Sequence, residues 1–214
     1  MLGKKIPVAT EGAPFIGLLA LASIVFAILN WPVTAVASLA ATAFVLYFFR
    51  DPERVVPNGD DFVVSPADGR VIEVKAASEG SLQGSEVIRV SIFMNIFNVH
   101  VNRAPISGSV ARIEYKEGTF WAADKNRAVV ENERNSLLLV SDNGFECTVV
   151  QVAGLIARRI VCWAEEGDSL KRGERFGLIR FGSRLDVYLP KDVPVLVRKG
   201  QRVLAGQTVL ALKK

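Results

Sequence analysis

Three short segments of the 214-residue chain contain residue types that carry acid–base or nucleophilic chemistry. Asp68 lies in a Ser-Pro-Ala-Asp-Gly segment, His100 lies among several asparagines, and Ser183 follows Gly182. His100 is the only histidine, so acid–base chemistry by an imidazole can come from this residue alone. An imidazole titrates near neutral pH, whereas a serine hydroxyl needs a neighbouring base to act as a nucleophile. These segments are therefore the first candidates for a catalytic site.

Each candidate also has a purely structural interpretation. An aspartate before glycine often hydrogen-bonds its own backbone in a β-turn, and Gly-Ser before a strand normally forms a turn or bulge. A single histidine is usually a satisfied structural residue. The surroundings of His100 are unusual for a plain strand, because a dense group of polar residues lies there beside Phe93 and Phe97: Asn95, Asn98, Asn102 and Arg103.

Composition excludes several classes of function. One histidine and two cysteines exclude a two-histidine metal motif and a four-cysteine zinc site, so we expect no metal. The net charge of +4 includes no long basic run and no interleaving of aromatic and basic residues after residue 50, so we expect no nucleic acid partner. Cys147 and Cys162 lie in alternating apolar segments and are expected to be small core residues.

The region from Pro14 to Phe49 is almost continuously apolar and contains no charged residue. As a single helix it would be about 54 Å long, which exceeds the roughly 30 Å hydrocarbon core of a bilayer. The sequence Asn-Trp-Pro at positions 30–32 interrupts it. Because proline favours the start of a helix and tryptophan the membrane interface, we predict two short helices, 15–29 and 33–49, joined by a tight turn.

Basic residues flank this hairpin at both ends, at Lys4, Lys5, Arg50 and Arg54. The positive-inside tendency then places both ends, and the rest of the chain, on the cytoplasmic side of the cell (inner) membrane. A shallow re-entrant hairpin remains an alternative. A cleaved signal peptide fits poorly, because a second apolar helix follows and no clear cleavage site is present.

The remainder of the chain reads as β-structure. Short apolar segments alternate with turns, and none keeps helical periodicity over three turns. Asp142-Asn143-Gly144 predicts a hairpin turn. We divide the chain into a membrane-anchoring hairpin, 1–50, and a β-rich catalytic domain, 51–214, with strands expected at 62–64, 70–74, 87–93, 108–115, 136–140, 145–152 and 155–163.

The C-terminal region contains an internal repeat. Residues 166–177 read like residues 199–210, and both have the pattern Gly-x-x-apolar-x-x-Gly-x-x-apolar. Glycines in such a pattern suit tight corners with positive φ. The pattern resembles biotinyl/lipoyl-type domains, and residues 65–71 resemble the opening turn of such a unit. We therefore expect a mainly β, barrel-sandwich or hybrid-motif-like fold, without the Met-Lys tip of a carrier domain.

Taken together, these segments resemble the short-form phosphatidylserine decarboxylase proenzymes over the whole length of the chain. The most specific parts are the block Phe-Asn-Val-His-Val-Asn-Arg-Ala-Pro at 97–105 and Arg-Phe-Gly-Ser at 180–183, found in this order. Phe-Phe-Arg-Asp-Pro at 48–52 and the segment at 65–69 add to the resemblance.

The resemblance implies self-cleavage between Gly182 and Ser183, giving a β chain, 1–182, and an α chain, 183–214, that stay together as a heterodimer. Ser183 would become a covalent pyruvoyl group, the cofactor that accepts electrons when phosphatidylserine loses CO₂ to give phosphatidylethanolamine. His100 is the expected base for cleavage and the first candidate for returning a proton. Asp68 is expected to orient His100, as in a Ser-His-Asp set.

The chain departs from the longer family members, which have His-x-x-His where this chain has His100 followed by Arg103. Either His100 serves both steps, or water or another group covers one. Arg184, beside the future pyruvoyl group, is expected to bind a phosphate or carboxylate, or else to be a solvated strand charge. Asn95, Asn98, Asn102 and Arg103 are the alternative headgroup site.

The alternative function is a non-enzymatic, membrane-anchored barrel-sandwich adaptor, which would keep its chain intact. A hybrid-motif zinc peptidase is excluded by the single histidine. A homo-oligomer is compatible with either function, and the sequence does not determine the acyl-chain preference.

Overall fold

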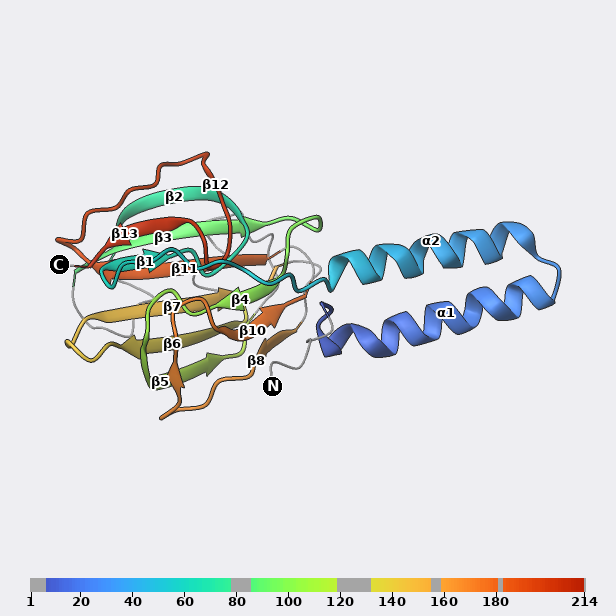
Figure 1. Cartoon of the computed structure of the whole chain (residues 1–214), viewed down its shortest axis with the longest axis horizontal. Coiled ribbons are helices and arrows are strands. Elements are labelled where there is room, and N and C mark those ends of the chain that lie inside the picture. The colour runs from blue at the N-terminus through green and yellow to red at the C-terminus, as the bar shows by residue number, and fades with distance from the viewer. Residues whose placement is uncertain (1–6, 78–85, 119–131, 155–158, 181–182, 214) are drawn as a thin grey trace. The chain divides into compact units, whose positions relative to one another are not determined.

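The computed structural model describes residues 7–77, 86–118, 132–154, 159–180 and 183–213 (Figure 1). The chain divides into two compact units, residues 1–53 and residues 54–214. The first contains helices and the second contains strands, which confirms the expected mainly β class with an N-terminal helical segment.

The first unit is a hairpin of two helices. A short 3-10 turn, Thr10–Gly12, leads into α1, Ala13–Ile28, and α2 follows at Pro32–Phe48. The predicted bounds are confirmed to within two residues. Asn30 adopts a positive φ of 57° in the connection, and Pro32 occupies the first turn of α2, where its missing N–H is no loss.

A polar contact joins the two helices while most apolar side chains face outward. Ser38 of α2 is buried within the hairpin and donates a hydrogen bond of 2.9 Å to the Leu19 carbonyl oxygen of α1. Leu18 and Val33 are 67% and 81% exposed. The segment Thr10–Ile28 is long and apolar enough to cross a membrane, and α2 is a shorter apolar helix. Exposed leucine and valine faces of this kind indicate association with a membrane.

The second unit is built from antiparallel strands. Its main sheet has the order β12-β2-β3-β11-β7-β6-β5-β9 among the described residues, and Figure 1 shows β2, β3 and β11 side by side. A smaller sheet has the order β4-β10-β8, and β1 pairs with β13. The strands are β1 Phe62–Val64, β2 Gly69–Ala77, β3 Val87–Met94, β4 Val101–Arg103, β5 Gly108–Lys116, β6 Arg134–Val140, β7 Glu146–Val152, β8 Ile160–Cys162, β9 Ser169–Leu170, β10 Arg175–Ile179, β11 Ser183–Pro190, β12 Arg202–Val203 and β13 Val209–Leu212.

Every segment predicted as a strand contains one, although the last expected strand is shorter than predicted. Only residues 160–162 of the expected 155–163 form β8, and residues 155–158 lie outside the described part of the chain. The predicted turn at 142–144 joins β6 to β7, with Gly144 at a φ of 78°. The predicted strands ended at residue 163, so they missed β9–β13, including the eight-residue β11 that begins at Ser183, and they also missed β4.

The strands of the main sheet have the same arrangement when they are counted inward from either edge. The order β12-β2-β3-β11 from one edge matches the order β9-β5-β6-β7 from the other. We call β1–β3 with β11–β13 the first half, and β4–β7 with β9 and β10 the second half. The C-terminal repeat seen in the sequence supplies one copy to each half, because β9 pairs with β5 and β12 pairs with β2.

The glycines of that repeat have the backbone that their spacing predicts. Gly167 and Gly173 have φ values of 92° and 80°, and the corresponding Gly200 and Gly206 have values of 90° and 72°. L-residues with a Cβ rarely adopt this region, so glycine favours all four corners. The expectation of tight, positive-φ corners is confirmed.

The two copies also make the same backbone contacts. The Gly206 N–H donates to the Ser65 carbonyl oxygen at 2.7 Å, and the Gly173 N–H donates to the Ala104 carbonyl oxygen at 2.8 Å. Each contact joins a repeat corner to the turn that opens the facing strand, β2 or β5. The two halves are therefore one structural unit used twice.

One face of the main sheet encloses the hydrophobic core. Side chains of β3, β7 and β11 alternate toward it, among them Val90, Ile92, Leu185 and Val187, all fully buried. Cys147 packs in the same core, and burial raises the pKa of its thiol. Its expected role as a small core residue is confirmed.

Candidate active site

Strand register brings three distant parts of the chain to one end of the main sheet. Ser183, the first residue of β11, lies opposite Met94, the last residue of β3. Arg70, at the start of β2, lies opposite Phe93. The turn containing Asp68 runs into β2 at this same end. The antiparallel pairing therefore gathers the ends that carry the candidate residues.

His100 reaches this region through the smaller sheet. It precedes β4 and is 3% exposed. Its carbonyl oxygen accepts a backbone hydrogen bond of 3.4 Å from Ile179, the last residue of β10. Ser183 follows Ile179 by four residues, a distance of about 14 Å at most for an extended chain. The fold thus ties His100 to the strand that leads toward Ser183.

The His100 ring is oriented by a backbone carbonyl. Its Nδ1 atom lies 3.0 Å from the carbonyl oxygen of Asn98. A carbonyl oxygen can only accept, so Nδ1 carries the proton in this arrangement. Nε2 is then the basic nitrogen of the neutral ring.

Asp68 has other partners than the histidine it was expected to orient. Its Oδ1 accepts the Ala205 backbone N–H at 2.7 Å, and its Oδ2 forms an ion pair of 2.7 Å with Arg54. Both side chains of this pair are largely buried. Among the described hydrogen bonds, the Nδ1 position that a Ser-His-Asp set gives to aspartate belongs to Asn98 instead. This differs from the expectation, because both Asp68 oxygens bind groups other than His100.

Ser183 is enclosed by the surrounding residues. It is fully buried, and its Oγ has no hydrogen-bond partner among the described residues. Buried hydroxyl groups are normally hydrogen-bonded, and exceptions often occur at functional sites. Gly182, the other half of the expected cleavage bond, lies outside the described residues.

Asn102 belongs to a buried chain of amides. Its Oδ1 accepts a 2.9 Å hydrogen bond from Gln151 Nε2, and Gln151 Oε1 accepts one of 3.1 Å from Asn135 Nδ2. The Asn102 Nδ2 atom faces the Met94 sulfur at 3.8 Å, beside the strand start that holds Ser183. Sequence reasoning missed Gln151, although a glutamine within the valine-rich β7 was a usable signal.

Arg184 points away from Ser183. Successive strand residues face opposite sides of a sheet, so Arg184 lies on the face opposite Ser183. Its guanidinium donates to Asp186 Oδ1 at 2.6 Å and to Ser91 Oγ at 2.7 Å, and the residue is 1% exposed. Neither expected role, a headgroup contact or a solvated charge, matches this placement.

The face around Arg184 is a buried charged cluster. Arg89 pairs with Glu73, and the pKa of Arg89 is raised because Asp186 and Glu73 outweigh the effect of burial. Burial, together with Asp186, raises the pKa of Tyr188 to about 12. These groups stabilise one another inside the first half.

The remaining headgroup candidates also have local partners. Arg103 is 4% exposed and donates to the Gly173 carbonyl oxygen at 2.9 Å. Asn95 and Asn98 build a tight turn after β3, in which Asn98 Oδ1 accepts the Asn95 N–H at 2.9 Å. Asn95 Oδ1 accepts the Phe97 N–H at 2.9 Å. Of the five expected headgroup residues, Asn95 and Asn98 line the cleft of about 520 Å³ described next.

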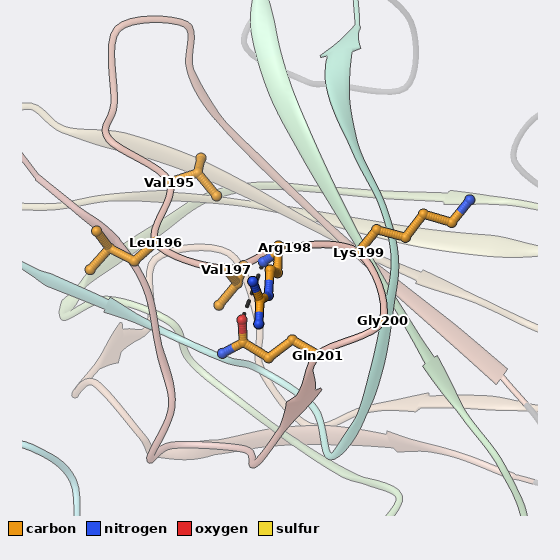
Figure 2. A pocket seen from close by; sticks show the side chains of 7 residues that line it. All are labelled: Val195, Leu196, Val197, Arg198, Lys199, Gly200 and Gln201. Carbon is orange, nitrogen blue, oxygen red and sulfur yellow. Dashed lines mark hydrogen bonds between the residues drawn. The ribbon is translucent and has the colours of Figure 1, made fainter.

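Two clefts differ in their relation to this region. One of about 890 Å³ is lined by the single segment 195–201, and Figure 2 shows Lys199 extending away from Arg198 and Gln201. None of the predicted site residues lines it. The other cleft, of about 520 Å³, lies over the starts of β2 and β12 and includes the Asn95–Asn98 turn. The second cleft is therefore the one that adjoins the candidate site.

Comparisons with known proteins agree on one family. The family model for phosphatidylserine decarboxylase matches residues 41–211. A phosphatidylserine decarboxylase proenzyme of Geotalea uraniireducens is 50% identical over 212 residues, covering 99% of both chains. Proteins of the same name from Desulfotalea psychrophila and Oleidesulfovibrio alaskensis are 49% and 52% identical, over 98% and 97% of this chain and 98% and 94% of their own lengths.

Proposed function

The chain belongs to the phosphatidylserine decarboxylase family, and on this premise we propose that it decarboxylates phosphatidylserine to phosphatidylethanolamine with a pyruvoyl group made from its own Ser183. The observation that carries this proposal is the Ser183 hydroxyl, fully buried at the start of β11 and without a hydrogen-bond partner among the described residues. A buried hydroxyl without a partner among the described residues suits a group that the protein consumes.

In the proposed maturation, Ser183 Oγ attacks the carbonyl carbon of Gly182 and the peptide nitrogen leaves, so that an ester replaces the amide. Loss of the Ser183 α proton and of the ester oxygen then breaks the chain. Gly182 keeps the carboxylate and ends the β chain, 1–182. The dehydroalanine left at 183 takes up water and releases ammonia, leaving the pyruvoyl group at the start of the α chain, 183–214. The two chains remain together as a heterodimer through the β11 pairings.

His100 is the proposed base for this cleavage. Because the Asn98 carbonyl oxygen holds the proton on Nδ1, Nε2 is the nitrogen that can take the proton of the Ser183 hydroxyl. In this arrangement a backbone carbonyl orients the ring, and Asp68 acts as a positioning residue through the turn that it stabilises. The adjacent Pro66 carbonyl oxygen accepts the Arg103 N–H at 2.9 Å, which links this turn to β4.

The site fits a pyruvoyl group, because position 183 is buried and its side-chain oxygen has no described internal partner to lose. When present, the group supplies a conjugated carbonyl that accepts the electron pair left by departing CO₂. The surrounding residues exclude water, and His100 returns a proton to the product from Nε2.

The hairpin fits a lipid substrate. Drawing a diacyl lipid out of a bilayer costs about 0.8 kcal/mol for each CH₂ exposed, so an enzyme held at the surface needs to take in only the headgroup. We infer that α1 and α2 anchor the enzyme in the cell (inner) membrane. The basic flanks of the hairpin support a cytoplasmic position for the catalytic domain.

The decisive experiment is the intact mass of the purified full-length protein, before and after treatment with hydroxylamine. We expect two chains split between Gly182 and Ser183, and the smaller chain should gain the mass of the reagent because it carries a reactive carbonyl. Ser183→Ala should remain a single chain with no activity, whereas Ser169→Ala, an exposed serine of the repeat, should mature normally. A wild-type chain that stays whole and unreactive in membranes would contradict the proposal and favour the adaptor.

A further inference from the structure

The cleft beside the candidate site contains two arginines that none of the proposed steps uses. It has a volume of about 520 Å³, and Arg70 and Arg202 contribute to its lining together with Phe93, Phe97 and Leu204. Both arginines are exposed. The cleft therefore combines two cations with an apolar wall.

The arginine pair has no compensation within the described structure. Arg70 of β2 and Arg202 of β12 are directly opposite in the antiparallel register, so both project from the same face. Like charges in such a pair destabilise a sheet. No hydrogen bond or ion pair joins either guanidinium to another described residue. The fold accepts this repulsion without an internal anion to relieve it.

The second half shows that the fold does not require arginine here. The same register position between β5 and β9 holds Ser109 opposite Ser169. Both positions follow the glycine turn that opens the strand, and both halves make the same corner hydrogen bonds. The same backbone therefore forms with two small polar residues at these positions. The arginine pair occurs only in the half that contains Ser183.

The apolar wall of the cleft is open to solvent. Phe97 is 59% exposed and Leu204 is 46% exposed, on two different loops. An anion recognised here would have an apolar portion next to it. A phospholipid has this combination, with a phosphodiester beside its glycerol and acyl chains.

The cleft lies within headgroup distance of the proposed reactive position. Arg70 is opposite Phe93 on β3, and the next residue of β3, Met94, is opposite Ser183 on β11. One strand therefore separates Arg70 from β11, and two strand spacings amount to about 10 Å. By this register Arg70 shares the sheet face of Phe93 and Arg184, opposite the face of Ser183, so a headgroup would pass round the ends of β3 and β11, where Asn95 and Asn98 line the cleft.

We propose that Arg70 and Arg202 bind the phosphodiester of the phospholipid substrate, while Phe97 and Leu204 contact its glycerol and upper acyl region. This inference rests on the proposed function, because that function supplies a serine amine at position 183 and a phosphate a few atoms away. Arg70 shares the sheet face of Arg184, but it is exposed in the cleft, whereas Arg184 is buried and bound to Asp186 and Ser91.

The test is equilibrium binding of glycerophosphoserine to the full-length protein in detergent micelles, by calorimetry, with inorganic phosphate as the second probe. Arg70→Gln with Arg202→Gln should weaken glycerophosphoserine binding about tenfold or more, because charge-assisted hydrogen bonds to phosphate are lost. Arg112→Gln with Lys116→Gln removes two exposed charges from β5 and should change nothing. Equal affinity of the wild type and the Arg70/Arg202 variant for glycerophosphoserine would overturn the proposal.

A second readout separates this inference from the proposed function. With short-chain phosphatidylserine below its micelle concentration, the double variant should raise KM about tenfold and leave kcat within twofold. If the wild type releases no CO₂, the proposed function fails, and the binding measurement still decides the cleft. Inorganic phosphate binding as tightly as glycerophosphoserine would make this a simple phosphate site and overturn the lipid assignment.

Discussion

The two halves of the main sheet start from the same backbone and diverge in a few side chains and one connection. In the second half a tight turn at 142–144 joins β6 to β7. In the first half the corresponding neighbours, β3 and β11, are not consecutive, and Ser183 opens β11 where the other half has its turn. The proposed cleavage bond thus replaces a hairpin connection, so cutting it leaves the paired strands in place.

The turns before β2 and β5 show a second difference. In the second half the Ser107 hydroxyl accepts the Arg172 backbone N–H at 3.0 Å, and in the first half Asp68 accepts the equivalent N–H of Ala205 at 2.7 Å. The hydrogen bond that both halves have in common stabilises the turn. The second carboxylate oxygen of Asp68, which binds Arg54, is what the first half adds.

The largest expected effect is on the rate of self-cleavage, and it compares His100 with Asp61, the residue in the corresponding place of the first half. Asp61 precedes β1 as His100 precedes β4, and its carbonyl oxygen also accepts a backbone N–H, from Lys213 at 2.6 Å. His100→Ala should slow self-cleavage by about 10²- to 10⁴-fold, the usual contribution of a general base. Exposed Asp61→Ala should cleave at the wild-type rate.

Cleavage is followed by gel electrophoresis of freshly synthesised chain, and thermal unfolding of both variants checks that they fold. If Asp61→Ala is as slow as His100→Ala, the effect belongs to the shared backbone arrangement and His100 is not the base. Normal cleavage by a folded His100→Ala protein would also remove it from the mechanism.

The next largest effect is on the free energy of unfolding, and it compares the turns before β2 and β5. Asp68→Ala leaves Arg54 largely buried without its anion, a change that typically costs about 3–5 kcal/mol of stability. Ser107→Ala removes only a neutral hydrogen bond, worth about 1 kcal/mol. Urea unfolding of the full-length protein in micelles measures both. Equal losses would show that the ion pair with Arg54 adds nothing to the turn.

The smallest effect tests the repulsion between the two arginines. Arg70→Ser with Arg202→Ser copies the second half and should stabilise the protein by up to about 1 kcal/mol, in the range of cross-strand pairs. Ser109→Arg with Ser169→Arg should destabilise it by a similar amount. Salt screens exposed charges, so both differences should shrink at 1 M sodium chloride in thermal unfolding. If the stability changes are the same at low and high salt, the effect comes from side-chain packing and not from charge repulsion.

The sequence predicted the features that depend on neighbouring residues. The apolar run with its Asn-Trp-Pro break predicted both helices, and alternating apolar residues predicted most of the longer strands, although β11 was missed. The glycine spacing predicted corners with positive φ, which Gly167 and Gly200 both adopt. Two-residue strands such as β9 and β12 escaped prediction, because a pair of residues shows no periodicity.

The candidate site was predicted less completely than the fold. The sequence indicated Ser183 and His100, because serine after glycine and a single histidine stand out by type. The predicted strands ended at residue 163, so sequence reasoning missed that Arg184 faces away from Ser183 and binds Asp186. Sequence reasoning also missed that Arg70 and Arg202 lie opposite each other, because that depends on the register of two strands distant in the sequence.

The sequence by itself determined the helical hairpin, the β class and the repeated glycine corners, because periodic burial and the φ restriction act over a few residues. Only the tertiary structure decided the partners of the polar atoms. Asp68 meets Ala205 across 137 positions, and Gln151 meets Asn102 across 49. A buried polar atom must find a partner wherever the fold supplies one, and that choice depends on long-range register that local patterns do not encode.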